Sequence, residues 1–195
     1  MKNTTRLLFL ASLALGLLAP ARAATETYSI DPVHSTVQFS LRHIISRFTG
    51  SFTKVSGTIL VDRANLENSS VEAVIDVASL NTANDKRNAD LSGPSYFDLA
   101  KYTTMTFKST AWKKTGDDTF DVTGDLTIKG VTKPVVLKVK LLGFSPGMRP
   151  GTNLSGWEVS TTIQKADFGV TGPAMLGKAL GDEVTVNIGV EADLK

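Results

Sequence analysis

The sequence predicts an all-β domain, built as a sandwich or as a closed barrel. Apolar and polar residues alternate in many short segments, Gly, Asn and Asp separate most of these segments, and helix-start signals are confined to residues 82–102. A strand that buries one row of side chains and exposes the other produces this two-residue period. Many short strands with few helices are typical of sandwiches and barrels.

Residues 1–23 precede this domain and have the features of a secretory signal. Lys2 and Arg6 are followed by an apolar run of 13 residues and then by Ala21-Arg22-Ala23, which offers small residues to a signal peptidase. The run is shorter than the roughly 20 residues that span a membrane. We expect cleavage after Ala23, export to the periplasm and no stable membrane insertion of the mature chain.

The mature chain is long enough for one domain with a single core. Residues 1–23 carry three of the 21 basic residues and none of the 19 acidic ones, so the remaining 172 residues have a net charge of −1. Interspersed, nearly balanced charge predicts no nucleic-acid partner and gives no footprint for an anionic membrane. The chain contains no Cys, so its stability depends on burial and backbone pairing alone.

The first predicted strand shows the clearest alternation. Odd positions from 37 to 41 are Val, Phe and Leu, and even positions from 38 to 42 are Gln, Ser and Arg. Asp31-Pro32 predicts a bend before this strand, because Pro fixes its own φ and restricts its neighbour. If the strand runs straight, His43 continues the apolar row and faces the interior.

The remaining elements follow in order along the chain. With the first segment, further alternating segments make about eight strands, the later ones near 50–62, 70–78, 104–113, 118–129, 134–144, 155–166 and 183–193.

Residues 82–102 and two loops interrupt this pattern. Thr82-x-x-Asp85 and Ser95-x-x-Asp98 resemble helix-capping boxes, so we expect a short helical insertion in two pieces, near 83–91 and 96–101. Residues 145–155 and 168–181 are predicted loops. Met175 lies in the second loop, where an adaptable apolar side chain can gate a cavity.

Few residues are candidates for catalysis or metal binding. The only histidines are His34 and His43. A zinc site normally needs three or four Cys, His or carboxylate ligands, so we expect no metal centre. Asp31-x-x-His34 could form a general-base pair, but no nucleophile or glycine elbow stands nearby. We therefore favour the alternative that Asp31 caps the turn before the strand.

The argument for ligand binding is architectural. Eight antiparallel strands can close into a barrel with room for one small ligand. The predicted interior is apolar and is supplied by Phe39, Leu41, Phe52, Val55, Ile59, Ile75, Val77, Phe107, Leu126, Ile128, Trp157 and Val159. The same residues could instead fill a packed barrel, and the pattern does not separate the two cases.

Several longer segments add a resemblance. They are YSIDPVHSTVQFSLRHIISRFTGSF at 28–52, SVEAVIDVASLNT at 70–82, YFDLAKY at 96–102, GDLTIKGVTKPVVL at 124–137 and DFG at 167–169. In this order they resemble the YceI-like family of secreted, lipid-binding β-barrel proteins. The resemblance implies an extended, lipocalin-like, eight-stranded antiparallel barrel with a short helical lid, which holds an isoprenoid or another long-chain lipid.

The resemblance also implies a site. The expected pocket residues are Phe39, Leu41, His43, Phe52, Ile75, Val77, Phe97, Phe107, Trp157, Phe168 and Met175, and the head-group candidates are Arg87, Asp90 and Lys165. The family usually reads Arg-Asp-x-His-Leu at 87–91 and Asn-Arg-x-Asp-Phe-Gly at 164–169. This chain has RNADL and QKADFG there, which favours a neutral head such as a quinone or an amide over a pyrophosphate.

We therefore predict a non-catalytic carrier of an isoprenoid, quinone or fatty amide. No cofactor is required on this reading, and an isoprenoid quinone or a similar lipid is the candidate bound molecule. The sequence is compatible with a homodimer. The alternatives are a small secreted hydrolase or isomerase that uses His34 or His43, and a ligand-free structural barrel that makes protein contacts.

Overall fold

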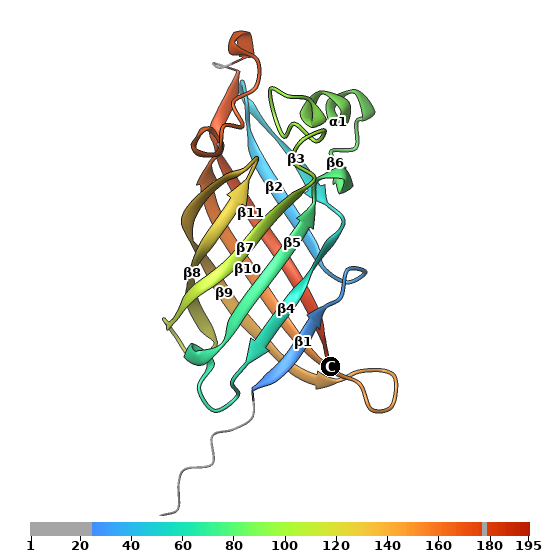
Figure 1. The fold of residues 1–195 in the computed structure, drawn as a ribbon, viewed down its shortest axis with the longest axis vertical. Coiled ribbons are helices and arrows are strands. Elements are labelled where there is room, and N and C mark those ends of the chain that lie inside the picture. The colour runs from blue at the N-terminus through green and yellow to red at the C-terminus, as the bar shows by residue number, and fades with distance from the viewer. Residues whose placement is uncertain (1–24, 177–178) are drawn as a thin grey trace, which may run out of the picture.

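A computed structural model describes residues 25–176 and 179–195 (Figure 1). The predicted signal sequence at 1–23 lies outside the described residues. Within them the chain forms one antiparallel sheet of eleven strands: β1 (Glu26–Ile30), β2 (Thr36–His43), β3 (Ser46–Phe52), β4 (Val55–Val61), β5 (Ser70–Asp76), β6 (Leu80–Asn81), β7 (Thr104–Lys114), β8 (Thr119–Ile128), β9 (Val131–Pro146), β10 (Asn153–Gln164) and β11 (Leu180–Leu194).

Eight of these strands close into a barrel. Neighbours run β1-β4-β5-β7-β8-β9-β10-β11, and β11 pairs back onto β1 from Ile30↔Ala192 to Tyr28↔Leu194. The other three strands extend the sheet in the order β11-β2-β3-β6. The predicted fold class, an eight-stranded antiparallel barrel with a short helical insertion, is confirmed.

Two bends account for two of the three strands that the structure has beyond the predicted eight, and the two-residue β6 is the third. β1 and β2 pair with successive parts of β11, so together they act as one strand broken at residues 31–35. The bend falls at Asp31-Pro32, as expected. The strand predicted near 50–62 is likewise broken at Thr53-Lys54, between β3 and β4. There Thr53 N donates to Ser79 O and Asp76 N donates to Lys54 O, so this bend pairs with the turn after β5.

The helical insertion is shorter than predicted. Helix α1 (Asp85–Ser92) begins after Asn84, whose side chain accepts a hydrogen bond from Arg87 N, and not at Thr82. The second predicted piece, 96–101, is wrong, because this segment forms hydrogen-bonded turns. Asp98 has a φ of 50°, and a left-handed residue does not propagate an α-helix. Short 3₁₀ turns occupy η1 (Leu66–Asn68), η2 (Val77–Ser79), η3 (Lys165–Phe168) and η4 (Ala174–Leu176).

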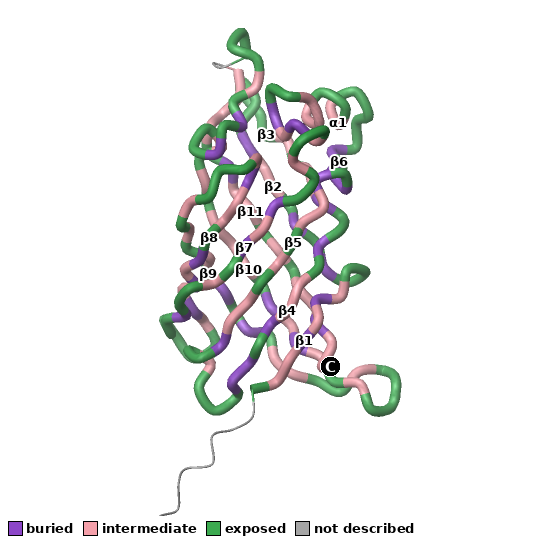
Figure 2. The backbone as a smooth tube through the Cα atoms, in the orientation of Figure 1, coloured by how far each residue is buried: buried purple, intermediate pink, exposed green. Residues whose placement is uncertain are grey.

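Along the strands, buried or half-buried residues alternate with exposed ones (Figure 2). On β2, Val37 and Leu41 are buried, whereas Gln38 and Arg42 are exposed. Opposite ends of the barrel carry different connections: α1 lies at one end, and the chain terminus after β11 lies at the other (Figure 1). Among the described residues, no helix combines the length and the hydropathy of a membrane span.

Candidate ligand cavity inside the barrel

The barrel encloses a cavity of about 210 Å³. Every strand of the eight-stranded ring contributes to its wall, and so do β2, β3, α1 and the loops near α1. Among the described residues, the lining side chains are apolar or aromatic except Thr161 and Lys165. Apolar cavities of about 150 Å³ stay dry and accept apolar guests such as benzene or xenon. This lumen is therefore suited to an apolar molecule and not to ordered water.

Most of the predicted pocket residues lie on the cavity wall. These are Phe39, Leu41, Phe52, Ile75, Phe97, Phe107, Trp157 and Phe168. The other three do not lie there. His43, the last residue of β2, is exposed. Val77 is buried in η2, where the backbone leaves the alternation of β5, and Met175 projects from η4 with 88% of its surface exposed.

Several wall residues were not predicted, and the structure gives the reason for two of them. On β7 the cavity-lining residues before the bulge, Met105 and Phe107, are at odd positions, whereas Trp112 is at an even one. The change occurs because a bulge between Ser109 and Ala111 shifts the register of the strand. Tyr96 reaches the wall because a loop glycine packs against its ring. A Cβ on Gly172 would lie 2.7 Å from that ring, and this residue has a φ of 75°. The bulge has no signal in the alternation itself.

Aromatic side chains seal the end of the barrel away from α1, which we call the closed end. Ring centroids are 5.9 Å apart between Tyr28 and Phe144, 6.1 Å between Phe144 and Trp157, and 5.8 Å between Trp157 and Trp112. Phe120 adds a further ring 5.9 Å from Trp112. Tyr28, Trp157 and Phe120 are at most 2% exposed. A ligand therefore cannot enter at this end without unpacking the core.

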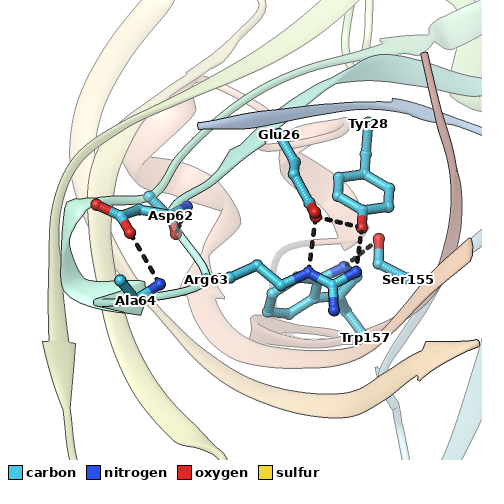
Figure 3. Close-up of polar contacts among 8 residues, drawn as sticks. Glu26, Tyr28, Asp62, Arg63, Ala64, Ser155 and Trp157 are labelled. Atoms are coloured by element: carbon cyan, nitrogen blue, oxygen red, sulfur yellow. Dashed lines mark hydrogen bonds and ion pairs between the residues drawn. The ribbon is translucent and has the colours of Figure 1, made fainter. Parts of the chain in front are cut away.

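A polar network completes the closed end (Figure 3). Tyr28 Oη donates to Glu26 Oε2 at 2.7 Å, and Arg63 donates to the same carboxylate at 2.7 Å and to Tyr28 Oη at 2.9 Å. The guanidinium also lies 3.8 Å above the Phe144 ring. Burial alone would raise the pKa of Glu26, but the hydrogen bonds from Tyr28 and Arg63 hold it below its ordinary value.

The two tryptophans of the closed end differ in their hydrogen bonding. Trp157 Nε1 donates to Ser155 Oγ at 3.1 Å, and both groups are buried. Trp112 Nε1 is buried and has no hydrogen-bond partner. An unsatisfied buried donor costs free energy, so Trp112 is the weaker element of this end.

The mouth of the cavity lies at the opposite end, beside α1. There the lining includes half-buried residues, beside buried ones such as Tyr96 and Phe168; the half-buried ones are Phe48, Leu91, Phe97, Lys165 and Leu180. Lys165 is the charged residue of the wall, and 13% of its side chain is exposed. Its Nζ lies 3.6 Å from Asp182 Oδ1 and 3.5 Å from Thr171 O.

Of the three head-group candidates, only Lys165 lies on the cavity wall. The Arg87 guanidinium donates to Thr82 Oγ1 and Thr82 O, and lies 4.9 Å from the centre of the Phe48 ring, so it braces the mouth from outside. Asp90 is exposed on α1 and pairs with Lys86 at 3.2 Å.

The predicted Asp31–His34 pair forms outside the cavity. His34 Nδ1 lies 2.7 Å from Asp31 Oδ2 and 3.7 Å from Glu191 Oε1, and the three groups could hold a cation. Hydrogen bonding to Asp31, together with the charges of Asp31 and Glu191, raises the pKa of the exposed His34. Asp31 also accepts from Val33 N, so the pair stabilises the turn between β1 and β2. The adjacent Ser35 hydroxyl is buried and donates to Glu191 O.

Comparisons with known proteins agree with this architecture. The model of the YceI-like domain matches residues 28–192. A UPF0312 protein from Pseudomonas syringae pv. tomato is 38% identical over 182 residues, which cover 90% of this chain and 94% of the relative.

Solved structures show the same fold. BcnA from Burkholderia cenocepacia superposes with a TM-score of 0.72 at 26% identity, covering 83% of this chain and 98% of BcnA. A polyisoprenoid binding domain from Saccharophagus degradans has a TM-score of 0.65 at 20% identity, covering 86% and 98% of the two chains. With its matching family model, its close relatives and its closed barrel, this chain belongs to the YceI-like family.

Proposed function

We propose that this protein is a non-catalytic periplasmic carrier that holds a long apolar ligand in the barrel lumen. The observation that carries the proposal is the apolar cavity, which is sealed at the closed end and lined by half-buried residues at the mouth. The predicted signal sequence supports the compartment. The family and the shared fold with a polyisoprenoid binding domain support a lipid as the ligand class.

Magnitudes favour an occupied lumen. At about 24 cal/mol per Å³, a void of 210 Å³ costs roughly 5 kcal/mol of stability, which a well-fitting apolar chain would recover. Ten buried methylene groups would contribute on the order of 8 kcal/mol before the costs of association. Such a chain could enter through the mouth without breaking any hydrogen bond of the closed end.

Charges on the cavity wall and on α1 favour a neutral polar head, such as a quinone or an amide. Asp182 lies beside Lys165 and offsets its charge, and Arg87 is committed to Thr82. Asp90 adds a carboxylate on α1, already paired with Lys86. A pyrophosphate would therefore meet no uncompensated cation on the cavity wall, whereas a neutral head could accept a hydrogen bond from Lys165 Nζ.

The carrier proposal is tested by recovering the ligand. Mature protein purified without detergent is examined by native mass spectrometry and by solvent extraction, and a stoichiometric long-chain species is expected. Protein that emerges empty and then fails to bind any added isoprenoid or long-chain amide would overturn the proposal.

The head-group proposal is tested by competition. Protein loaded with a fluorescent apolar probe is titrated with a neutral isoprenoid quinone and with an isoprenyl pyrophosphate of equal chain length. The quinone is expected to displace the probe at lower concentration. Tighter binding of the pyrophosphate that is lost in Lys165→Ala, but kept in the control Lys86→Ala, would overturn the neutral-head proposal and leave the carrier proposal standing.

A further inference from the structure

The turn between β2 and β3 exposes two apolar residues, which we call the tip: Ile44 and Ile45. They are 56% and 98% exposed. Ile44 has a φ of 51°, at the first central position of a two-residue hairpin turn. Such positions favour Gly, Asn or Asp, because a β-branched residue is strained there. The tip thus carries backbone strain and exposed apolar surface, and neither of these helps the fold.

Hydrogen bonds hold the tip beside a second exposed apolar segment. Ile44 N donates to Ala179 O at 2.7 Å, and Arg42 Nη1 donates to Ile44 O at 2.8 Å. The chain before Ala179 includes η4, where Met175 and Leu176 are 88% and 38% exposed. Figure 1 shows the β2–β3 hairpin and η4 at the same end of the barrel.

This surface borders the mouth of the cavity. His43, the last residue of β2, pairs with Leu180, and Leu180 lines the cavity. Phe48, four residues after Ile44, also lines the cavity. A molecule that leaves the lumen through the mouth therefore passes next to the tip.

Two arginines lie directly behind the tip. Arg42 pairs with Arg47 across the hairpin, an arrangement of like charges that costs stability. Their hydrogen-bond acceptors are all neutral: Arg42 donates to Ile44 O, and Arg47 donates to Ser40 O, Ser40 Oγ and Thr185 Oγ1. Among the described residues, neither forms an ion pair.

Acidic groups near the hairpin come from the bulge of β11 opposite Arg42. Asp182 accepts a hydrogen bond from Ala166 N and lies beside Lys165, so it is already engaged. Glu183 is exposed on the same bulge. Arg42 and Arg47 thus outnumber the unengaged Glu183 in this part of the sheet, so the local charge next to the tip is positive although the mature chain is nearly neutral.

We propose that this end of the barrel docks on an anionic phospholipid bilayer. Ile44, Ile45 and Met175 enter the interface between head groups and acyl chains, while Arg42 and Arg47 contact lipid phosphates. Exposed apolar side chains next to cations are the combination that binds such interfaces. Docking in this orientation places the mouth against the lipid. The docking does not depend on which ligand fills the lumen, although its use in loading the ligand rests on the proposed carrier function.

Vesicle flotation tests the docking. Mature protein is mixed with phosphatidylglycerol-containing vesicles or with pure phosphatidylcholine vesicles, and is expected to float with the anionic ones in a salt-sensitive manner. In Ile44→Gly/Ile45→Asn the bound fraction should fall at least about fivefold, because apolar insertion is lost. Arg42→Gln/Arg47→Gln should lose the preference for anionic lipid. The double turn variant introduces residues that suit the turn, so loss of folding would not confuse the result.

Matched controls separate the possible outcomes. Met148→Ser removes an exposed methionine at the closed end and should leave flotation unchanged. Probe loading into the lumen should be equal in the wild type and the turn variant, so failure of docking is distinguishable from failure of the carrier function. Wild-type protein that does not float, or floats as well without the isoleucines, would overturn the proposal. Concentration-dependent dimerisation that the turn variant abolishes, with no vesicle binding, would assign the surface to a protein interface instead.

Discussion

The two ends of the barrel differ in how tightly their side chains are packed. At the closed end, a row of aromatic rings, all but Phe144 buried, runs from Tyr28 to Trp112, and Arg63 contacts a carboxylate, a hydroxyl and a ring. At the mouth, several wall residues are only half-buried, the hairpin turn is strained at Ile44, and α1 buries none of its residues. Dense packing gives one end its stability, whereas loose packing at the other end leaves a route into the lumen. On the carrier proposal, stability and ligand exchange belong to different regions of one sheet.

Truncation at the closed end should have the largest effect. Trp157→Ala removes the ring that joins Trp112 to Phe144, and should lower the free energy of unfolding by about 3–5 kcal/mol. Leu91→Ala at the mouth removes a half-buried side chain and should cost less than about 2 kcal/mol. Urea unfolding measures both. Equal losses would show that the two ends do not differ as described.

Charge inside the lumen should have the next largest effect. Phe39 packs against Phe48 and Phe52 on the cavity wall, so Phe39→Asp should cost on the order of 3 kcal/mol and abolish binding of an apolar probe. Ser40→Asp places its carboxylate on the outer face next to Arg47, which already donates to Ser40 Oγ. Stability and probe binding should therefore change little. If both variants behave alike, the assignment of faces on β2 is wrong.

The two tryptophans sharpen the comparison within the closed end. Trp157→Phe leaves Ser155 Oγ buried without its donor, and should cost about 1 kcal/mol or more. Trp112→Phe removes a donor that has no partner, so it should be neutral or stabilising by up to about 1 kcal/mol. Thermal unfolding of both variants at one pH shows whether each substitution lowers or raises the stability. A larger loss for Trp112→Phe would mean that its indole N–H is bonded in solution.

The Asp31–His34 turn should produce the smallest effect, because the pair is exposed and screened by salt. The folded pKa of His34 is raised, so its contribution is fully present below about pH 6.5 and disappears as the pH rises through the raised value. Hydrogen bonding to His34 lowers the pKa of Asp31, so the contribution of Asp31 disappears as the pH falls through that lowered value.

The measurement is the unfolding midpoint against pH for the wild type and His34→Gln. Stabilisation of the wild type relative to the variant should be greatest between about pH 4 and pH 6.5, and should shrink in high salt. A difference that grows above pH 8 would contradict this assignment. A loss of enzymatic activity in His34→Gln would instead revive the hydrolase or isomerase alternative.

Local patterns of the sequence determined where the strands lie and which rows face inward. Alternation reports how a side chain sits on its own backbone, so it located Phe39, Leu41 and Phe107 on the wall without knowledge of any neighbour. Asp31-Pro32 marked the first bend for the same local reason. The choice of a barrel over a sandwich came from the resemblance, because alternation is the same in both.

Tertiary structure decided what depends on residues far apart in the chain. β1 meets β11 across more than 160 residues, and this pairing closes the barrel. A bulge in β7 turns Trp112 inward, and the turn after β5 removes Val77 from the wall. The ion pair between Lys165 and Asp182, and the hydrogen bond from Ile44 N to Ala179 O, form only when separate strands and loops come together. Register, closure and unfilled volume arise from long-range packing, which short-range periodicity does not encode.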